Sequence, residues 1–302
     1  MSSGILDPQA LARIANLELR AKTVVEGFLT GLHQSPYHGF SVEFAQHRPY
    51  NPGDNLKHLD YRVLARTERY YIKQFQEETN LKAYLLVDHS ASMGFPPPNL
   101  SGEYNAVTKL HYAVSLAASL AFLLLRQRDA VGLVPFAEKV DAILPPRSAM
   151  GYLETLLVQL EGLKAEGQTR TSSVLFEIAE RVTRRGLVVL ISDLWDDPDR
   201  VLSSLRAVRY VGHEVILFQV LHPREIEFNF SRDGLFQDLE TNEELPVRPW
   251  HLKDHYQKHL KAHLERIKSE ARAARIDYFL CPTDQPYEIA LFEFLVRRKR
   301  LM

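Results

Sequence analysis

The sequence has almost no cysteine and no apolar run long enough to cross a bilayer. Cys281 is the single cysteine among 302 residues, so an internal disulfide and a thiolate metal site are both excluded. The most apolar stretch, Ala113 to Leu125, contains two serines and falls short of the roughly 20 residues that a membrane span needs. The first residues lack the basic and apolar regions of a secretory signal. We therefore expect a cytoplasmic protein in a reducing compartment, without a membrane span.

An excess of charge of one sign is also missing, as are the common catalytic motifs. Lys and Arg number 37 against 38 Asp and Glu, and a net charge of −1 gives no global attraction for nucleic acid or anionic membrane. The chain contains no Gly-x-Ser-x-Gly elbow, phosphate-binding P-loop or dinucleotide-binding glycine fingerprint. These absences favour a protein that is not an enzyme and has no nucleic-acid partner.

What the sequence does contain is an alternation of apolar strands with helices of 10 to 20 residues. Leu81 to Val87 is a nearly continuous apolar strand, as expected of a strand covered on both faces. Further strands are predicted at residues 130–136, 140–144, 187–192, 214–220 and 276–280. The pattern predicts an α/β fold, with a doubly wound, mostly parallel sheet that has helices on both faces, as in Rossmann-like proteins.

The organisation along the chain predicts two parts. Residues 1–79 hold one amphipathic helix, which begins near Pro8, and then a turn-rich segment rich in proline and glycine. Residues 80–302 form the α/β domain, with a hairpin excursion at about 225–248.

Oxygen-bearing side chains follow two of the predicted strands. Asp88, Ser90 and Ser92 come directly after the first apolar strand, and Asp193 follows the strand at 187–192. Thr169 lies in a loop before a helix. Ligands of open parallel sheets bind beyond the carboxyl ends of the strands, and carboxylates with hydroxyls suit a hard cation. The sequence therefore predicts a divalent-cation site, for which magnesium or manganese fits best and calcium is an alternative.

These residues resemble the metal-ion-dependent adhesion site (MIDAS) of von Willebrand factor A domains. That site has the pattern Asp-x-Ser-x-Ser, a distant Thr and a distant Asp, which here correspond to Asp88, Ser90, Ser92, Thr169 and Asp193. The chain departs from the family at Gln168, where a glycine is usual, and at Leu194, where the last Asp is usually followed by Gly. Thr171 is a second threonine close to the predicted one. The resemblance implies a binding site in which the cation receives a carboxylate from a partner protein.

An upstream block resembles one family in particular. The run Arg48-Pro49-Tyr50-Asn51-Pro52-Gly53-Asp54, continued through Asp60-Tyr61, is similar to the signature of domain of unknown function 58 (DUF58), with Tyr61 in place of the usual Trp. Relatives are typically encoded beside MoxR-type AAA+ ATPases. The resemblance implies an adaptor or chaperone partner of such an ATPase, which binds an Asp or Glu of the ATPase or its client.

Several alternatives stay open beside this interpretation. Asp88, Ser90 and Ser92 alone could cap a turn, and Asp88 could instead be the nucleophile of a metal-dependent hydrolase. The site could also be vestigial on a structural scaffold. Asp196 and Asp197 are interpreted as helix caps, and the Arg48 to Asp60 block as a structural plug. A histidine stripe recurs every four residues, at His251, His255, His259 and His263, and is interpreted as a solvated or partner-facing helix face.

Overall fold

The computed structural model describes residues 8–33, 47–49, 70–73, 81–97, 107–182, 185–230 and 233–299. The chain divides into two compact units, of which the larger contains residues 1–28 with 81–302 and the smaller contains residues 29–80. In the smaller unit, strand β1 (His47–Pro49) pairs antiparallel with β2 (Tyr71–Lys73). Apart from Arg48 and Pro49, the predicted signature block lies outside the described residues. Most of the first helix, up to residue 28, is grouped with the larger unit, and the smaller unit ends at residue 80.

The larger unit is built on one six-stranded sheet. Its strands are β3 (Lys82–Asp88), β4 (Ala130–Phe136), β5 (Leu144–Arg147), β6 (Leu187–Ser192), β7 (Glu214–Leu221) and β10 (Asp277–Pro282). The strand order is β10-β7-β6-β3-β4-β5, and every neighbouring pair is parallel except β4 with β5. This topology confirms the predicted doubly wound, mostly parallel sheet. The edge strand begins later than expected, because Val140 makes only an isolated bridge to Phe136.

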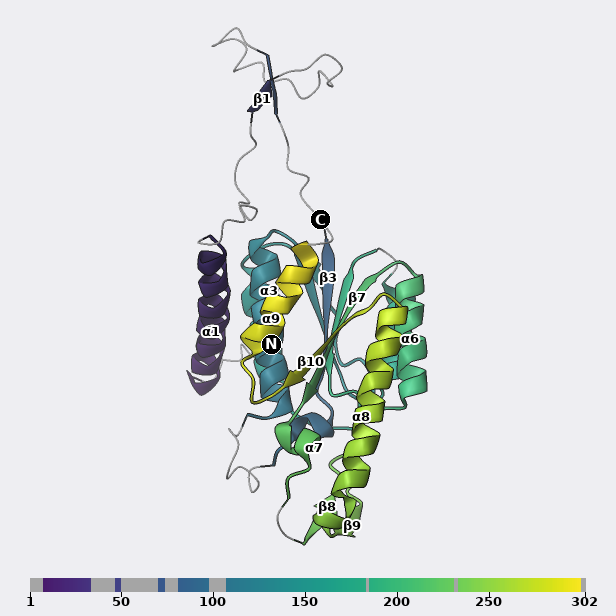
Figure 1. Ribbon diagram of the computed structural model, residues 1–302. Coiled ribbons are helices and arrows are strands. Elements are labelled where there is room, and N and C mark those ends of the chain that lie inside the picture. The colour runs from purple at the N-terminus through teal and green to yellow at the C-terminus, as the bar shows by residue number, and fades with distance from the viewer. Residues whose placement is uncertain are drawn as a thin grey trace. The chain divides into compact units, whose positions relative to one another are not determined.

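Helices cover both faces of the sheet, as Figure 1 shows. One face carries α1 (Pro8–His33), α3 (Lys109–Arg126), α4 (Tyr152–Glu161) and α9 (Tyr287–Lys299). The other face carries α5 (Thr171–Arg181), α6 (Pro198–Tyr210) and α8 (Pro249–Ala273). On this second face, apolar side chains of the three helices pack on alternate residues of the strands, for example Leu205 and Ile267 with Leu190 and Leu217.

Helix α3 is the apolar centre of the first face. It is the one described helix that is long and apolar enough, by length and composition, to cross a membrane, and 89% of it is buried inside the α/β unit. Helix α1 lies beside α3 in Figure 1. The side chain of Arg20 in α1 lies 3.1 Å from the His111 ring of α3. The apolar residues of α1 at helical spacing, including Leu17, Ala21 and Val25, are buried.

The predicted hairpin excursion leaves the sheet after β7. A short helix, α7 (Pro223–Glu227), precedes strands β8 (Gly234–Gln237) and β9 (Glu244–Val247), which pair antiparallel and confirm the hairpin. Figure 1 places α7 and the hairpin at the end of the sheet where β3 leads into the 3-10 helix η2 (Ala91–Gly94). The hairpin therefore lies at the carboxyl ends of the parallel strands, where binding sites form in this fold.

Candidate metal site at the carboxyl ends of the strands

Two buried aspartates form the centre of the candidate site. Asp88 is the last residue of β3 and Asp193 directly follows the neighbouring strand β6, and both are fully buried. One carboxylate oxygen of Asp88 accepts the Ser90 N–H at 2.9 Å, and the other accepts the Ser192 hydroxyl at 2.6 Å. Two acidic groups thus lie close together in the protein interior, an arrangement that calls for compensating positive charge.

The serine hydroxyls connect the two aspartates. Ser90 Oγ lies 3.1 Å from Ser92 Oγ, and Ser92 Oγ donates to an Asp193 oxygen at 2.8 Å. The structure therefore brings four of the five predicted residues, Asp88, Ser90, Ser92 and Asp193, into one hydrogen-bonded group.

Thr169 is near this group but has a different partner. Its loop is joined to the Asp88 loop by two backbone hydrogen bonds, from the Ala91 N–H to the Gly167 carbonyl and from the Glu166 N–H to the His89 carbonyl. Gly167 has φ of +84°, which a side chain would strain. The Thr169 hydroxyl donates to Glu240 at 2.5 Å rather than to any predicted site residue. Thr171 is fully buried, and its hydroxyl has no hydrogen-bond partner in the described part of the chain.

The residue after Asp193 has the left-handed backbone conformation. Leu194 has φ of +59° and is buried. A side chain at such a φ costs on the order of 1 kcal/mol, which gives a physical reason for the glycine that the resembled family usually has there. The apolar burial of Leu194 offsets that cost, so the departure noted in the sequence is compatible with the same turn.

A buried lysine, which the sequence did not single out, belongs to the same site. Lys109, the first residue of α3, is fully buried, and its ammonium donates to Asp193 at 2.7 Å and to Glu225 of α7 at 2.6 Å. Burial alone would lower the pKa of Lys109, but the charges of Asp193 and then Glu225 outweigh it, and the net shift is upward. Lys109 is therefore a fixed positive charge of the site.

The charges that remain fit a divalent cation. The Lys109 ammonium contacts two carboxylates, those of Asp193 and Glu225, and Asp88 is a third carboxylate beside Asp193. When all four groups are ionised, two negative charges remain. Burial, and then the charge of Asp193, raises the pKa of Asp88 from 3.8 to about 7. Asp88 thus lacks a counter-charge that a hard cation would supply, and the nearby hydroxyls are suitable ligands. The donor set fits magnesium or manganese.

Several side chains support the site from behind. Gln219 donates to the Asp193 carbonyl at 3.0 Å and accepts from the Tyr278 hydroxyl at 2.9 Å. Trp195 donates to Glu225 at 3.3 Å and stacks on His263 with ring centroids 5.6 Å apart. These contacts fix the loop after β6 and link it to α8.

The histidine stripe on α8 does not form a metal centre in the described residues. The Nε2 atoms of His255 and His259 are 3.1 Å apart. Within the described ranges, no cluster of three or more histidine, cysteine or acidic side chains could hold a metal ion. His263 instead packs under Trp195, and burial lowers its pKa. The stripe is therefore divided between an exposed pair and a residue that supports the candidate site.

The predicted helix caps are confirmed. The Asp197 side chain accepts the Asp199 N–H at 2.9 Å at the start of α6. An Asp196 oxygen accepts both the Ser172 N–H and the Ser172 hydroxyl, at 3.1 and 3.2 Å, in the first turn of α5. Both side chains satisfy N–H groups at helix N-termini, which agrees with their interpretation as caps.

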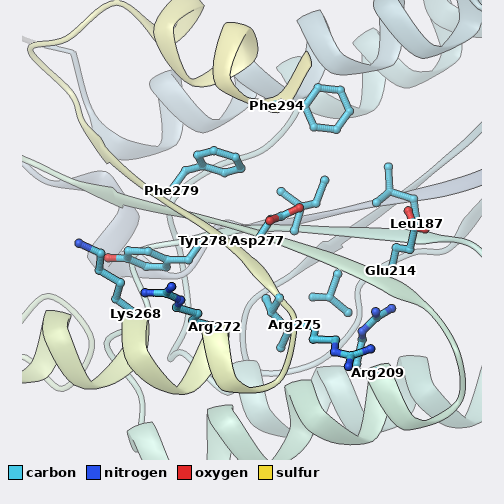
Figure 2. A pocket seen from close by; sticks show the side chains of 13 residues that line it. Leu187, Arg209, Glu214, Lys268, Arg272, Arg275, Asp277, Tyr278, Phe279 and Phe294 are labelled. Carbon is cyan, nitrogen blue, oxygen red and sulfur yellow. The ribbon is translucent and has the colours of Figure 1, made fainter. Parts of the chain in front are cut away.

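A larger cavity of about 600 Å³ lies at the opposite end of the sheet (Figure 2). Its walls include the first residues of β6, β7 and β10 and the last turns of α6 and α8. The basic side chains Arg209 and Arg272 that line it come from the last turns of those helices, where cations complement the helix dipole. Lys268 and Arg275 also line this cavity. We place the functional site at the carboxyl ends of the strands, because the buried carboxylates and the hydroxyls gather there.

Sequence reasoning missed Lys109, Glu225, Ser192 and Glu240. A weak signal existed for Lys109, because a lysine at the first position of an apolar helix opposes the helix dipole and needs a local reason. Glu225 is the third residue of a capping box with His222, which hides its second role. No sequence signal marks Ser192 or Glu240, because a serine is ordinary at a strand end and a glutamate is ordinary in a turn.

The class defined by this fold and site is an α/β protein with an acidic, hydroxyl-lined centre at a strand end. A family model described as "Protein of unknown function DUF58" matches residues 46–266, more than half of the chain, so the chain belongs to this family. The uncharacterized protein Rv1480 of Mycobacterium tuberculosis is 27% identical over 299 residues, which cover 97% of this chain and 91% of that protein. The uncharacterized protein Mb1516 of Mycobacterium bovis has the same identity and coverage.

Solved structures with a related arrangement were also found. The conserved hypothetical protein BatB from Bacteroides thetaiotaomicron matches with a TM-score of 0.44 and 15% identity, covering 73% of this chain and 99% of that chain. The SpRpn10 VWA domain matches with a TM-score of 0.37 and 12% identity, covering 68% of this chain and 89% of that one. At these scores, the fold assignment rests on the strand order of the sheet itself.

Proposed function

We propose that this protein is a non-catalytic interaction module of von Willebrand factor A type that binds a carboxylate of a partner protein through a divalent cation. The observation that carries the proposal is the pair of fully buried aspartates, Asp88 and Asp193, joined through the Ser90 and Ser92 hydroxyls. Such a group is costly in a protein interior unless a cation completes it.

Asp88, Ser90, Ser92 and Asp193 would hold the cation, directly or through water, and Ser192 would orient Asp88. A bound magnesium or manganese ion supplies an electrophilic position at which a carboxylate can replace water. Lys109 neutralises part of the charge of Asp193 and Glu225, so the site takes one divalent ion without a large excess of negative charge. The protein's own residues thus set the charge and geometry, and the partner supplies the last ligand.

Family membership supports the choice of partner. Because DUF58 proteins are typically encoded beside MoxR-type AAA+ ATPases, we propose such an ATPase or its client as the partner and the cytoplasm as the place of action. An enzymatic role is less well supported, because Ser90 occupies the position two residues after Asp88 where an aspartyl nucleophile would need a second acid. Both oxygens of Asp88 are also engaged as acceptors.

The test combines calorimetry with partner capture. We expect wild-type protein to bind one Mg²⁺ or Mn²⁺ ion and to retain a co-expressed MoxR-type ATPase in a pull-down that EDTA abolishes. Asp88→Ala should lose both activities. Glu214→Gln, which removes an exposed carboxylate from the opposite end of the sheet, is the matched control and should behave as wild type. Equal metal and partner binding by wild type and Asp88→Ala would refute the proposal.

A further inference from the structure

The turn of the β8–β9 hairpin reaches into the candidate site. Glu240, at the tip of the turn, accepts the Thr169 N–H at 2.9 Å with one carboxylate oxygen and the Thr169 hydroxyl at 2.5 Å with the other. The two residues are 71 positions apart, so this contact brings a separate part of the fold to the site. The Thr169 hydroxyl thus donates to Glu240 and not to any of the other four predicted ligands.

The turn is shaped to present this carboxylate. Asp238 accepts the N–H groups of Glu240 and Thr241 at 2.7 and 2.9 Å, and these bonds lower the pKa of Asp238. Asn242 completes the turn with φ of +60°, and its N–H donates to the Asp238 carbonyl. Because the turn is fixed by its own hydrogen bonds, Glu240 is held outward as a preformed ligand.

The rest of the hairpin is anchored mainly at its base. Its two strands pair only with each other, and Leu235 and Leu245 are about 60% exposed. At the base, Phe228 stacks on Tyr256 of α8 at 4.4 Å. Phe236 of β8 also packs against Phe228, with ring centroids 6.0 Å apart. The turn keeps its shape through its own hydrogen bonds, whereas its position over the site depends on the contact with Thr169, so it can be released without unfolding the six-stranded sheet.

A small cavity separates the turn from the buried aspartates. It has a volume of about 230 Å³, and its walls are Ser92, Phe95, Trp195, Glu225, Asp238, Leu239 and Glu240. This space is below the roughly 300 to 1,000 Å³ typical of sites for drug-sized ligands, and it has room for a single side chain. Because Glu225, Asp238 and Glu240 line it, an acidic side chain needs a bound cation beside it. Phe95 and Trp195 give it apolar walls beside Ser92.

We propose that Glu240 is a built-in competitor for the partner's carboxylate, which keeps the adhesion site closed until an acidic segment displaces the hairpin turn. This inference rests on the proposed function and adds its regulation. In the closed state the Glu240 carboxylate accepts hydrogen bonds from the N–H and the hydroxyl of Thr169. The partner presents one Asp or Glu beside an apolar residue, and its arrival frees the Thr169 hydroxyl to become the fifth ligand of the cation. The partner must therefore replace two charge-assisted hydrogen bonds, which selects against weak or neutral ligands.

The test uses Mn²⁺ and ¹³C-labelled acetate as a minimal carboxylate. Mn²⁺ broadens the NMR signal of acetate that binds to it, so a titration gives the acetate affinity of the metal-loaded protein. We expect Glu240→Ala to bind acetate at least about tenfold more tightly than wild type, within the usual range of coupling between sites. Glu243→Ala removes another carboxylate from the same turn and should match wild type. Glu240→Gln keeps the shape of the side chain without its charge, and should fall between them.

A second readout concerns Thr169 itself. In the wild-type background, Thr169→Ala should leave Mn²⁺ affinity unchanged, because the hydroxyl is already engaged by Glu240. In the Glu240→Ala background, the same change should weaken Mn²⁺ binding. Equal acetate affinity in wild type, Glu240→Ala and Glu240→Gln, or weaker affinity in the variants, overturns the competitor role while Asp88-dependent Mn²⁺ binding leaves the proposed function intact. If wild type binds no Mn²⁺, the proposed function itself fails.

Discussion

Substituting Asp88 by asparagine tests the electrostatics of the site most sharply. The folded state raises the pKa of Asp88 from 3.8 to about 7, first because of burial and second because of Asp193. The folded state therefore retains a proton over a pH window in which the unfolded chain has lost it. For this group, stability is fully present below pH 3.8 and is lost as the pH rises towards 7.

The size of the effect follows from this shift. In metal-free protein at pH 8, the ionised Asp88 carboxylate costs the fold up to about 4 kcal/mol relative to the unfolded chain. Asparagine is nearly isosteric, and it can still accept the Ser90 N–H while its amide meets the Ser192 hydroxyl, whose orientation can rotate. We therefore expect metal-free Asp88→Asn to be more stable than wild type by about 2 to 4 kcal/mol at pH 8. At pH 4 the two proteins should be nearly equal.

The assay is urea unfolding with and without Mn²⁺. Excess metal should stabilise wild type, by about 4.1 kcal/mol at a thousandfold excess over the dissociation constant, and should leave Asp88→Asn unchanged. The two curves should thus change order when metal is added at pH 8. An Asp88→Asn protein less stable than metal-free wild type at pH 8 would refute the reasoning, because the carboxylate would then stabilise the fold without a cation.

Three further predictions concern residues around the site. Burial, then Arg224 and Lys109, lowers the pKa of His222 from 6.5 to about 4, so its stabilising contribution is present above pH 6.5 and is lost on acidification. Between pH 7.5 and pH 5, the free energy of unfolding measured in urea should fall by about 2 kcal/mol more in wild type than in His222→Asn, because asparagine keeps a cap that stays neutral. Equal losses in the two proteins would contradict this. Lys109→Met leaves Asp193 and Glu225 without their cation, and it should lower the stability of the metal-free protein by about 3 kcal/mol or more. Adding Mn²⁺ should then stabilise the variant more than it stabilises wild type. An unchanged melting temperature of the metal-free variant would show that the ion pair contributes nothing. Replacing both His255 and His259 by alanine should leave Mn²⁺ affinity unchanged in calorimetry, whereas a loss of binding would move the metal to α8.

The sheet could be predicted from the sequence because its strands have a strong local signal. The strand at 187–192 is apolar up to its last residue, Ser192, and is buried on both faces, and its predicted bounds agree with the structure. The edge strand was predicted at 140–144 but spans Leu144–Arg147. The prediction stopped early because Pro145 and Pro146 are not typical strand residues. They fit there because β5 is an edge strand, where a missing N–H donor can be tolerated.

The sequence could predict those residues of the candidate site that directly follow neighbouring strands, because the sheet fixes where such residues lie. Asp88 and Asp193 end neighbouring parallel strands, and that geometry brings them together. Lys109 and Glu225 join them through helices whose packing the sequence pattern does not specify. Thr169 was predicted as a ligand, but its engagement by Glu240 depends on how a distant hairpin folds back, and no local signal reports that.

The most direct measurement of the central claim is anomalous X-ray diffraction from crystals of the protein grown with Mn²⁺. We predict one strong manganese peak within coordination distance of the Ser90 and Ser92 hydroxyls and beside the carboxylates of Asp88 and Asp193. The peak should disappear in crystals of Asp88→Asn grown under the same conditions. A manganese peak at the exposed His255 and His259 pair instead, or no peak at the strand ends in wild type, would contradict the account.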